Sequence, residues 1–65
     1  MARRPMSIAY RFYVIGDDNR ILSNELLIFA DDAEAHRQCQ TMLGKTAGAR
    51  AVEVWERARL VHRAE

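Results

Sequence analysis

Two histidines and one cysteine are the side chains of this sequence that come closest to a metal-binding pattern. His36 and Cys39 are three residues apart, so a helix would present both on one face, and His62 could supply a third ligand. A structural zinc site normally takes four ligands, often including paired cysteines, and the sequence holds 1 cysteine. We therefore predict no metal and no other cofactor, and we expect Cys39 to be a small apolar residue of a helix.

Acidic residues occur as two adjacent pairs, Asp17-Asp18 and Asp31-Asp32. A turn explains the first pair and a helix cap explains the second, and neither has the spacing of a calcium loop. The sequence contains no glycine-rich phosphate loop, no His-Glu-x-x-His motif and no nucleophile elbow. No base is guaranteed near Cys39, and a buried thiol is inert. These observations favour a protein that is not an enzyme and indicate no small-molecule substrate.

Arginine accounts for nine of the ten basic residues. Arginine and aromatic side chains together can hold nucleic acid, because guanidinium groups contact phosphates and aromatic rings stack on bases. The net charge of +1 is small for that function, and arginines also protect a sheet edge from aggregation. Nucleic-acid binding is therefore our alternative prediction, and it would use Arg11, Tyr13, Arg57, Arg59 and Arg63.

The length and composition of the chain indicate one small folded domain. It has 65 residues, of which 49% are apolar and 29% are charged. We expect residues 1–7 to form a flexible arm and residues 8–65 to form the domain. One cysteine cannot form an intrachain disulfide, no signal peptide is visible, and the longest apolar run, residues 26–30, is far shorter than the roughly 20 residues of a membrane helix. We predict a cytoplasmic protein without membrane contact.

A first strand is predicted over residues 8–15, which are rich in aromatic and β-branched side chains. Successive side chains of a strand point to opposite faces. One face of this strand is wholly apolar or aromatic, so we expect it to face the core. Its residues are Ile8, Tyr10, Phe12 and Val14.

A second strand is predicted over residues 20–30, after a turn at residues 16–19. Asn19 suits the turn because asparagine tolerates the left-handed conformation. The polar residues 23–25 interrupt the apolar pattern and predict a bulge or a break there. Residues 26–29 are apolar on both faces, which implies cover on both sides of the strand.

A helix is predicted over residues 32–43. Asp31 followed by Glu34 is the capping-box pattern, and acidic residues suit the positive end of the helix dipole. Gly44 is predicted as the C-terminal cap, and residues 45–50 as a flexible loop. The apolar stripe of the helix, with His36 at its margin, consists of Ala35, Cys39, Met42 and Leu43.

Two further strands are predicted over residues 51–56 and 59–63, joined by Arg57 and Ala58. The order of elements is therefore ββαββ, and the fold class is α+β. Two hairpins with a helix between them favour a four-stranded antiparallel sheet in the order 2-1-3-4. One helix covers one face of such a sheet, and only in part.

The C-terminal hairpin carries large apolar side chains on both of its faces. A turn at residues 57–58 fixes how its two strands pair. The predicted pairs are Trp55 with Leu60, Val54 with Val61, Glu53 with His62 and Val52 with Arg63. Only one face can lie under the helix, so the other directs either Trp55 with Leu60 or the valine set towards another surface.

An exposed apolar sheet face on so small a domain usually marks an interface. Apolar burial and chain ordering nearly cancel at this length, so association would supply the missing core. The leading prediction is an interaction module of unknown function that forms a homodimer or binds another protein. Alternatively, the loop over residues 45–50 and the N-terminal arm fold over this face. The predicted interface residues are Tyr13, Trp55, Leu60 and Val61.

Three short motifs lie in the predicted elements. Residues 10–13 read Tyr-Arg-Phe-Tyr, residues 30–35 read Ala-Asp-Asp-Ala-Glu-Ala, and residues 51–55 read Ala-Val-Glu-Val-Trp. Together with Arg59-Leu60-Val61, they resemble a group of short hypothetical proteins from alphaproteobacteria, over about residues 9–62. Those proteins often have glycine in both tight turns, where this chain has Asn19 and Arg57, so the turn types stay open. The resemblance implies a bacterial cytoplasmic protein of unknown function and transfers no catalytic residue.

Overall fold

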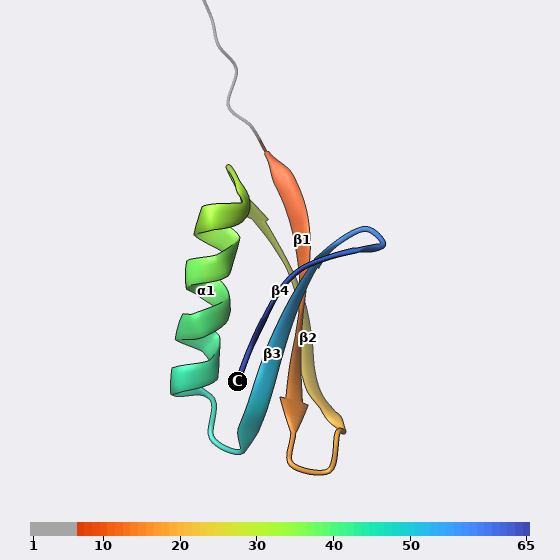
Figure 1. Cartoon of the computed structure of the whole chain (residues 1–65), viewed down its shortest axis with the longest axis vertical. Helices are drawn as coiled ribbons and strands as arrows, with labels where there is room; N and C mark the ends of the chain where they lie inside the picture. The colour runs from red at the N-terminus through yellow and green to blue at the C-terminus, as the bar shows by residue number, and fades with distance from the viewer. Residues whose placement is uncertain (1–6) are drawn as a thin grey trace, which may run out of the picture.

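Two β-hairpins flank a helix in the computed structural model, which describes residues 7–65 (Figure 1). The elements are β1 (Ile8–Gly16), β2 (Ile21–Phe29), α1 (Asp32–Lys45), β3 (Ala49–Glu56) and β4 (Arg59–Ala64). Neighbouring strands are antiparallel, and their order in the sheet is β2-β1-β3-β4. The predicted fold class, element order and strand order are confirmed. The predicted arm, residues 1–7, lies outside the described residues apart from Ser7.

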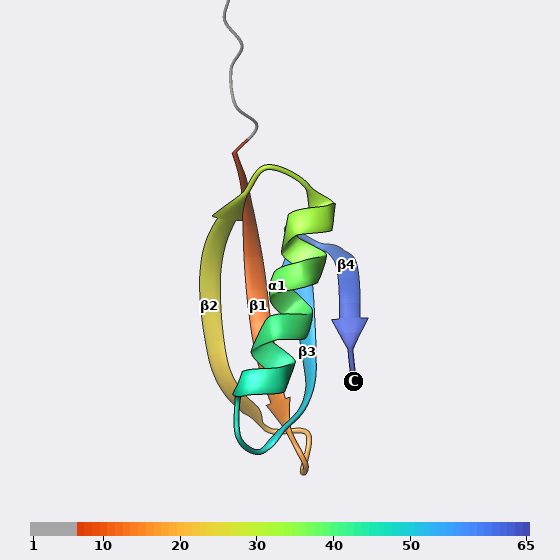
Figure 2. The same ribbon diagram turned by 90° about the vertical axis from the view of Figure 1, so that its left-hand side faces the viewer.

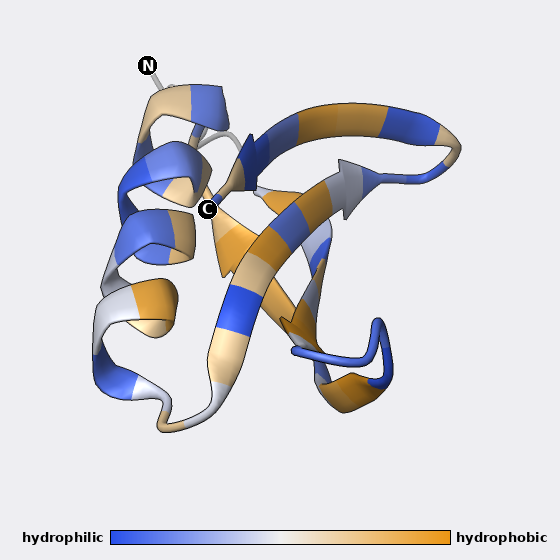
Figure 3. Cartoon of the chain, turned by 60° about the horizontal axis from the view of Figure 1, so that its bottom comes forward, coloured by the Kyte–Doolittle hydropathy of each residue, from blue (hydrophilic) through white to orange (hydrophobic). Residues whose placement is uncertain are grey.

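The helix covers one face of the sheet. Figure 2 shows α1 in front of the central strands, with β2 and β4 at the two edges. Apolar bands recur along the strands, whereas hydrophilic residues occupy much of the helix (Figure 3). The core therefore lies between α1 and the sheet. Its buried residues are Tyr10, Phe12, Val14, Ala35, Cys39, Met42, Val52, Val54 and Ala64.

Side chains of β1 alternate between the core and the opposite face, as their pattern predicts. Tyr10 and Phe12 are 0% exposed, while Arg11 and Tyr13 are half-buried on the other side. Phe29 of β2 closes this part of the core. Its ring centroid lies 6.3 Å from that of Tyr10 and 6.0 Å from that of Phe12.

The start of α1 is the predicted capping box. The Asp31 carboxylate accepts a hydrogen bond from the Glu34 N–H at 3.0 Å. The Glu34 carboxylate in turn accepts from the Ala30 N–H at 3.1 Å. Both bonds satisfy backbone donors that the helix itself leaves without partners.

The end of α1 differs from the prediction, because the helix continues to Lys45. Gly44 is not the C-terminal cap, so that prediction is wrong. The cap is Thr46, whose N–H donates to a carbonyl of the last turn at 3.1 Å. In the connection from the helix to β3, the residue in the left-handed region is Gly48, where φ is 83°. The connection to β3 is therefore shorter than the loop predicted over residues 45–50.

β2 is not broken where its polar residues predicted a bulge. Residues 23–25 pair regularly with β1. The extra residue is Leu22, where the register shifts between Val14 and Ile15 of β1. The polar residues fit within the strand because β2 lies at the edge of the sheet, where its central side chains reach water.

A bulge in β4 overturns most of the predicted pairing of the C-terminal hairpin. Trp55 lies opposite Leu60 as predicted, but beyond this pair Val61 has no partner and the register shifts by one residue. The shift turns the small Ala64 towards the core and Arg63 towards the opposite face. The observed pairs are Val54 with His62, Glu53 with Arg63 and Val52 with Ala64. The predicted pairs Val54 with Val61, Glu53 with His62 and Val52 with Arg63 are therefore wrong.

Both hairpin turns hold a residue other than glycine in the left-handed region. Asn19 has a φ of 63°, as its residue type predicts. Arg57 has a φ of 57°, although its β-carbon disfavours that conformation. The tip of the β3–β4 hairpin is therefore a strained position.

Candidate interaction surface

The side of the sheet opposite α1 carries apolar side chains that no segment of residues 7–65 covers (Figure 1). We call this side the open face. Strand alternation and pairing place residues from all four strands on it. Its large apolar members are Tyr13, Ile15, Ile21, Leu26, Ile28, Trp55 and Leu60.

Several aliphatic side chains of the open face are strongly exposed. Leu26 is 54% exposed, Ile28 59% and Leu60 45%. Ile21, opposite Ile15 on the same face, is 55% exposed, and the other large apolar side chain exposed within residues 7–65 is Leu22, at the start of β2. None of these residues lies on the helix, so the sheet supplies the main apolar surface of the described domain. Contiguous apolar patches of this kind on small proteins usually mark an interaction site.

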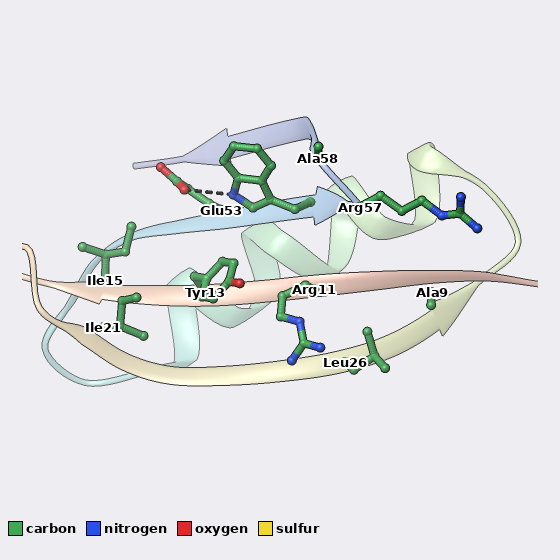
Figure 4. Close-up of a pocket in the computed structure, with 10 residues that line it drawn as sticks. Ala9, Arg11, Tyr13, Ile15, Ile21, Leu26, Glu53, Arg57 and Ala58 are labelled. Atoms are coloured by element: carbon green, nitrogen blue, oxygen red, sulfur yellow. Dashed lines mark hydrogen bonds between the residues drawn. The ribbon is translucent and has the colours of Figure 1, made fainter.

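The open face is hollowed beside β1 (Figure 4). The tip of the β3–β4 hairpin bends to the side away from α1 and forms one wall (Figure 1). Ala9 and Ala58 leave space because their side chains are short, and the hollow is also lined by Leu26, Trp55 and Arg57. The hollow has a volume of about 640 Å³, which is enough to receive several side chains of a partner.

Several polar groups on the open face already have partners within the chain. The Glu53 carboxylate accepts from the Trp55 indole N–H at 3.0 Å and from the Arg63 guanidinium. The Arg11 guanidinium donates to the Asn24 side-chain oxygen at 2.9 Å. A partner can therefore cover this face without leaving these groups unpaired, which is the main cost of burying polar atoms.

The predicted interface residues are brought together with one exception. Tyr13, Trp55 and Leu60 lie on the open face, with Trp55 directly opposite Leu60. Val61 is half-buried and packs against the core, because the bulge turns it to the helix side. We therefore leave Val61 out of the candidate surface.

The contribution of β2 was not predicted. Leu26 and Ile28 are among the most exposed aliphatic residues of the described chain, and both lie on the open face. The sequence shows that residues 26–29 are apolar on both faces of their strand. This apolar run indicates that β2 contributes to a surface on each side of the sheet. It does not tell whether the even-numbered or the odd-numbered residues face the helix.

The residues predicted for nucleic-acid binding do not form one basic patch. Arg59 is paired with Asp32 at 3.2 Å and with Glu56, and Arg63 is paired with Glu53 and Glu65. Both guanidinium groups are thus neutralised by carboxylates. The other two arginines of the prediction, Arg11 and Arg57, have no carboxylate partner among residues 7–65. Both line the hollow together with Tyr13.

Asp32 joins the helix start to two strands. The Tyr10 hydroxyl donates to an Asp32 carboxylate oxygen at 2.6 Å, and Arg59 bonds to both Asp32 oxygens. The hydrogen bond from Tyr10, followed by that from Arg59, lowers the pKa of Asp32, while burial raises the pKa of Tyr10. This cluster ties α1 to β1 and β4, so its groups have a structural explanation.

The predicted metal-ligand candidates point in different directions. Cys39 is buried, its thiol donates to the Val52 carbonyl at 3.1 Å, and burial raises its pKa. His36 and His62 stack on each other, with ring centroids 3.7 Å apart. Within residues 7–65, no group of three or more histidine, cysteine or acidic side chains is placed to hold a metal ion.

Comparison with known proteins identifies no relative of this chain. The chain matches no family model, no curated protein and no solved structure. Its resemblance to the alphaproteobacterial group therefore stays a prediction. Among residues 7–65, no helix is long and apolar enough to cross a membrane.

Proposed function

We propose that this protein is a self-associating module, in which the open faces of two copies pack against each other. The observation that carries the proposal is the exposed aliphatic surface of β2 and β4 on the side of the sheet that α1 leaves uncovered. Burying this surface removes apolar area from water, which is the dominant favourable contribution to association.

The size of the open face suits a small specific dimer. Four strands of 6 to 9 residues, spaced about 4.8 Å apart with about 3.3 Å per residue, cover at most roughly 19 by 30 Å. The accessible area of such a corrugated face approaches the roughly 800 Å² per partner that a standard interface buries. Two such faces would pack about 10 Å apart, as sheets in sandwiches do.

Charge distribution favours self-association over nucleic-acid binding. Arg59 and Arg63 are each held by two carboxylates, and the net charge of the chain is +1. Phosphate binding draws its affinity from free positive charge, so few free cations give only weak binding to phosphates. The apolar side chains of the open face need no such charge.

An arginine placed in the hollow tests the proposal. Ala9 is exposed on the open face, so Ala9→Arg would fill the hollow and bury a charge in the interface. Ala47→Arg is the matched control, because Ala47 is exposed in the turn between α1 and β3. The measurement is light-scattering mass across a concentration series.

We expect the unmodified protein to have a mass of at least twice the 7.5 kDa of one chain. Ala9→Arg should halve the observed mass, and Ala47→Arg should leave it unchanged. A mass of one chain at every concentration would overturn the proposal, as would an Ala9→Arg protein with the mass of the unmodified one.

A further inference from the structure

The two edges of the sheet differ in how they resist pairing with another strand. β4 is short, with 6 residues, and it carries a bulge at Val61. Arg59, His62 and Arg63 add charged or titratable side chains along it. Short length, bulges and charge are the ordinary means by which proteins block edge-to-edge pairing.

β2 has few of these protections. It has 9 residues, contains no proline or lysine, and continues regularly after its bulge at Leu22. Leu26 and Ile28 are more than half exposed near its middle and end. Among residues 7–65, no strand pairs with the outer edge of β2. Its outward backbone N–H and C=O groups are therefore open to another strand.

We propose that the outer edge of β2 pairs antiparallel with β2 of a second copy of this chain. The pairing would join the two sheets into one continuous sheet of eight strands about a two-fold axis. A second copy is the fitting partner because an antiparallel strand pair is compatible with two-fold symmetry and presents the same residues from both sides.

The position of the bulge selects a register for this pairing. The regular part of β2 runs from Ser23 to Phe29, and its midpoint is Leu26. A two-fold axis at this midpoint places Leu26 opposite Leu26 of the second copy and Glu25 opposite Leu27 of the second copy. An axis one residue earlier would set Glu25 against its own copy, and like charges directly opposite each other are destabilising.

This contact is separate from the face-to-face contact proposed above. In the joined sheet both helices would lie on one side and both open faces on the other. Leu26 and Ile28 of the two copies would then form one continuous apolar strip across the junction. Edge pairing and face packing can coexist, and two such symmetric contacts with crossing axes close into a tetramer.

Cross-linking through Glu25 tests the edge without touching the open face. Glu25 is exposed, and it lies on the helix side of β2 because it pairs with Phe12. In the proposed register, Glu25→Cys brings the two introduced thiols close to each other across the junction. In a face-to-face dimer the same thiols would lie on opposite outer sides. The native Cys39 is buried and stays unreactive towards a maleimide.

The experiment adds a short bis-maleimide cross-linker to Glu25→Cys in the Ala9→Arg background, which removes face packing. We expect a covalent dimer and a light-scattering mass of two chains. Ala47→Cys in the same background is the control. It should give no covalent dimer above the level of random collision, and its light-scattering mass should equal that of the Ala9→Arg protein.

The outcomes separate the two proposals. Edge pairing is overturned if the Ala9→Arg protein is monomeric and its Glu25→Cys variant yields no more covalent dimer than the Ala47→Cys control. That outcome leaves the proposed face packing intact. An Ala9→Arg protein that keeps the mass of the unmodified dimer and cross-links through Glu25→Cys supports edge pairing alone. A fourfold chain mass that Ala9→Arg reduces to two supports both contacts.

Discussion

The two histidines of the sequence meet at the boundary between α1 and β4. Their ring centroids are 3.7 Å apart, and the His36 ring lies within hydrogen-bond distance of the Gln40 amide. Burial, followed by the nearby His36, lowers the pKa of His62 below its usual value. The folded protein therefore holds His62 neutral at a pH where the unfolded chain would protonate it.

This shift predicts that stability depends on pH. The unfolded chain binds the extra proton, so the free energy of unfolding should be greatest above about pH 6.5 and should fall as the pH drops below it. The fall should end once the pH is below the folded pKa of His62. Urea unfolding across about pH 5 to 8 measures it, because histidine is the side chain that ordinarily changes charge in this range and the sequence has 2 of them.

His62→Gln is the variant that isolates this effect. It removes the titrating ring while keeping a polar side chain at the same place on β4. Its free energy of unfolding should change less with pH than that of the unmodified protein. An equally steep fall in the variant would show that other groups cause the pH dependence.

Single residues explain which parts of the candidate surface were predictable. Tyr13 has the parity that leaves the core, so the sequence places it on the second face, whereas the apolar pattern leaves open which face of the C-terminal hairpin carries Trp55 away from the helix. Val61 was misplaced because the position of a bulge depends on which side chains the core accepts, and here it accepts Ala64 instead of Arg63. No local pattern in the sequence encodes that choice.

At the scale of elements, the β3–β4 hairpin is held by a strained turn. A left-handed φ costs about 1–2 kcal/mol for a residue with a β-carbon, and Arg57 has a φ of 57°. Arg57→Gly should therefore raise the free energy of unfolding by ~0.5–1 kcal/mol, after allowing for the greater freedom of glycine in the unfolded chain. Within residues 7–65 the substitution removes no ion pair.

The β1–β2 turn offers a matched control for that substitution. Asn19 has a φ of 63°, and asparagine tolerates this region better than arginine does. Asn19→Gly should therefore stabilise the protein less than Arg57→Gly does. Chemical denaturation of the two variants side by side is the measurement. A loss of stability in Arg57→Gly, or an equal gain in both, would contradict the assignment of strain to Arg57.

The elements themselves were largely predictable, whereas their ends and bulges were not. The capping box at Asp31 and Glu34 is a local signal, and it marks the helix start correctly. The helix end was missed because Gly44 can remain helical when Thr46 caps the carbonyls. The bulge at Leu22 depends on how two strands meet, so the polar residues beside it gave a misleading signal.

At the scale of the whole molecule, one helix cannot cover four strands. The order β2-β1-β3-β4 leaves a full face and the outer edge of β2 without cover from residues 7–65. A chain of this length gains little net stability from its own core. Both features lead to the same expectation, which is that the folded chain is completed by further copies of itself.

The central claim is that association buries the open face, and Trp55 reports on this directly. It is the single tryptophan of the sequence, and it is half-buried on that face. The decisive measurement is its fluorescence emission over a dilution series of the folded protein. We predict emission at shorter wavelength at high concentration, a shift to longer wavelength on dilution, and only the long-wavelength emission in Ala9→Arg. Emission that stays constant while the light-scattering mass falls would contradict the claim, because association would then use another surface.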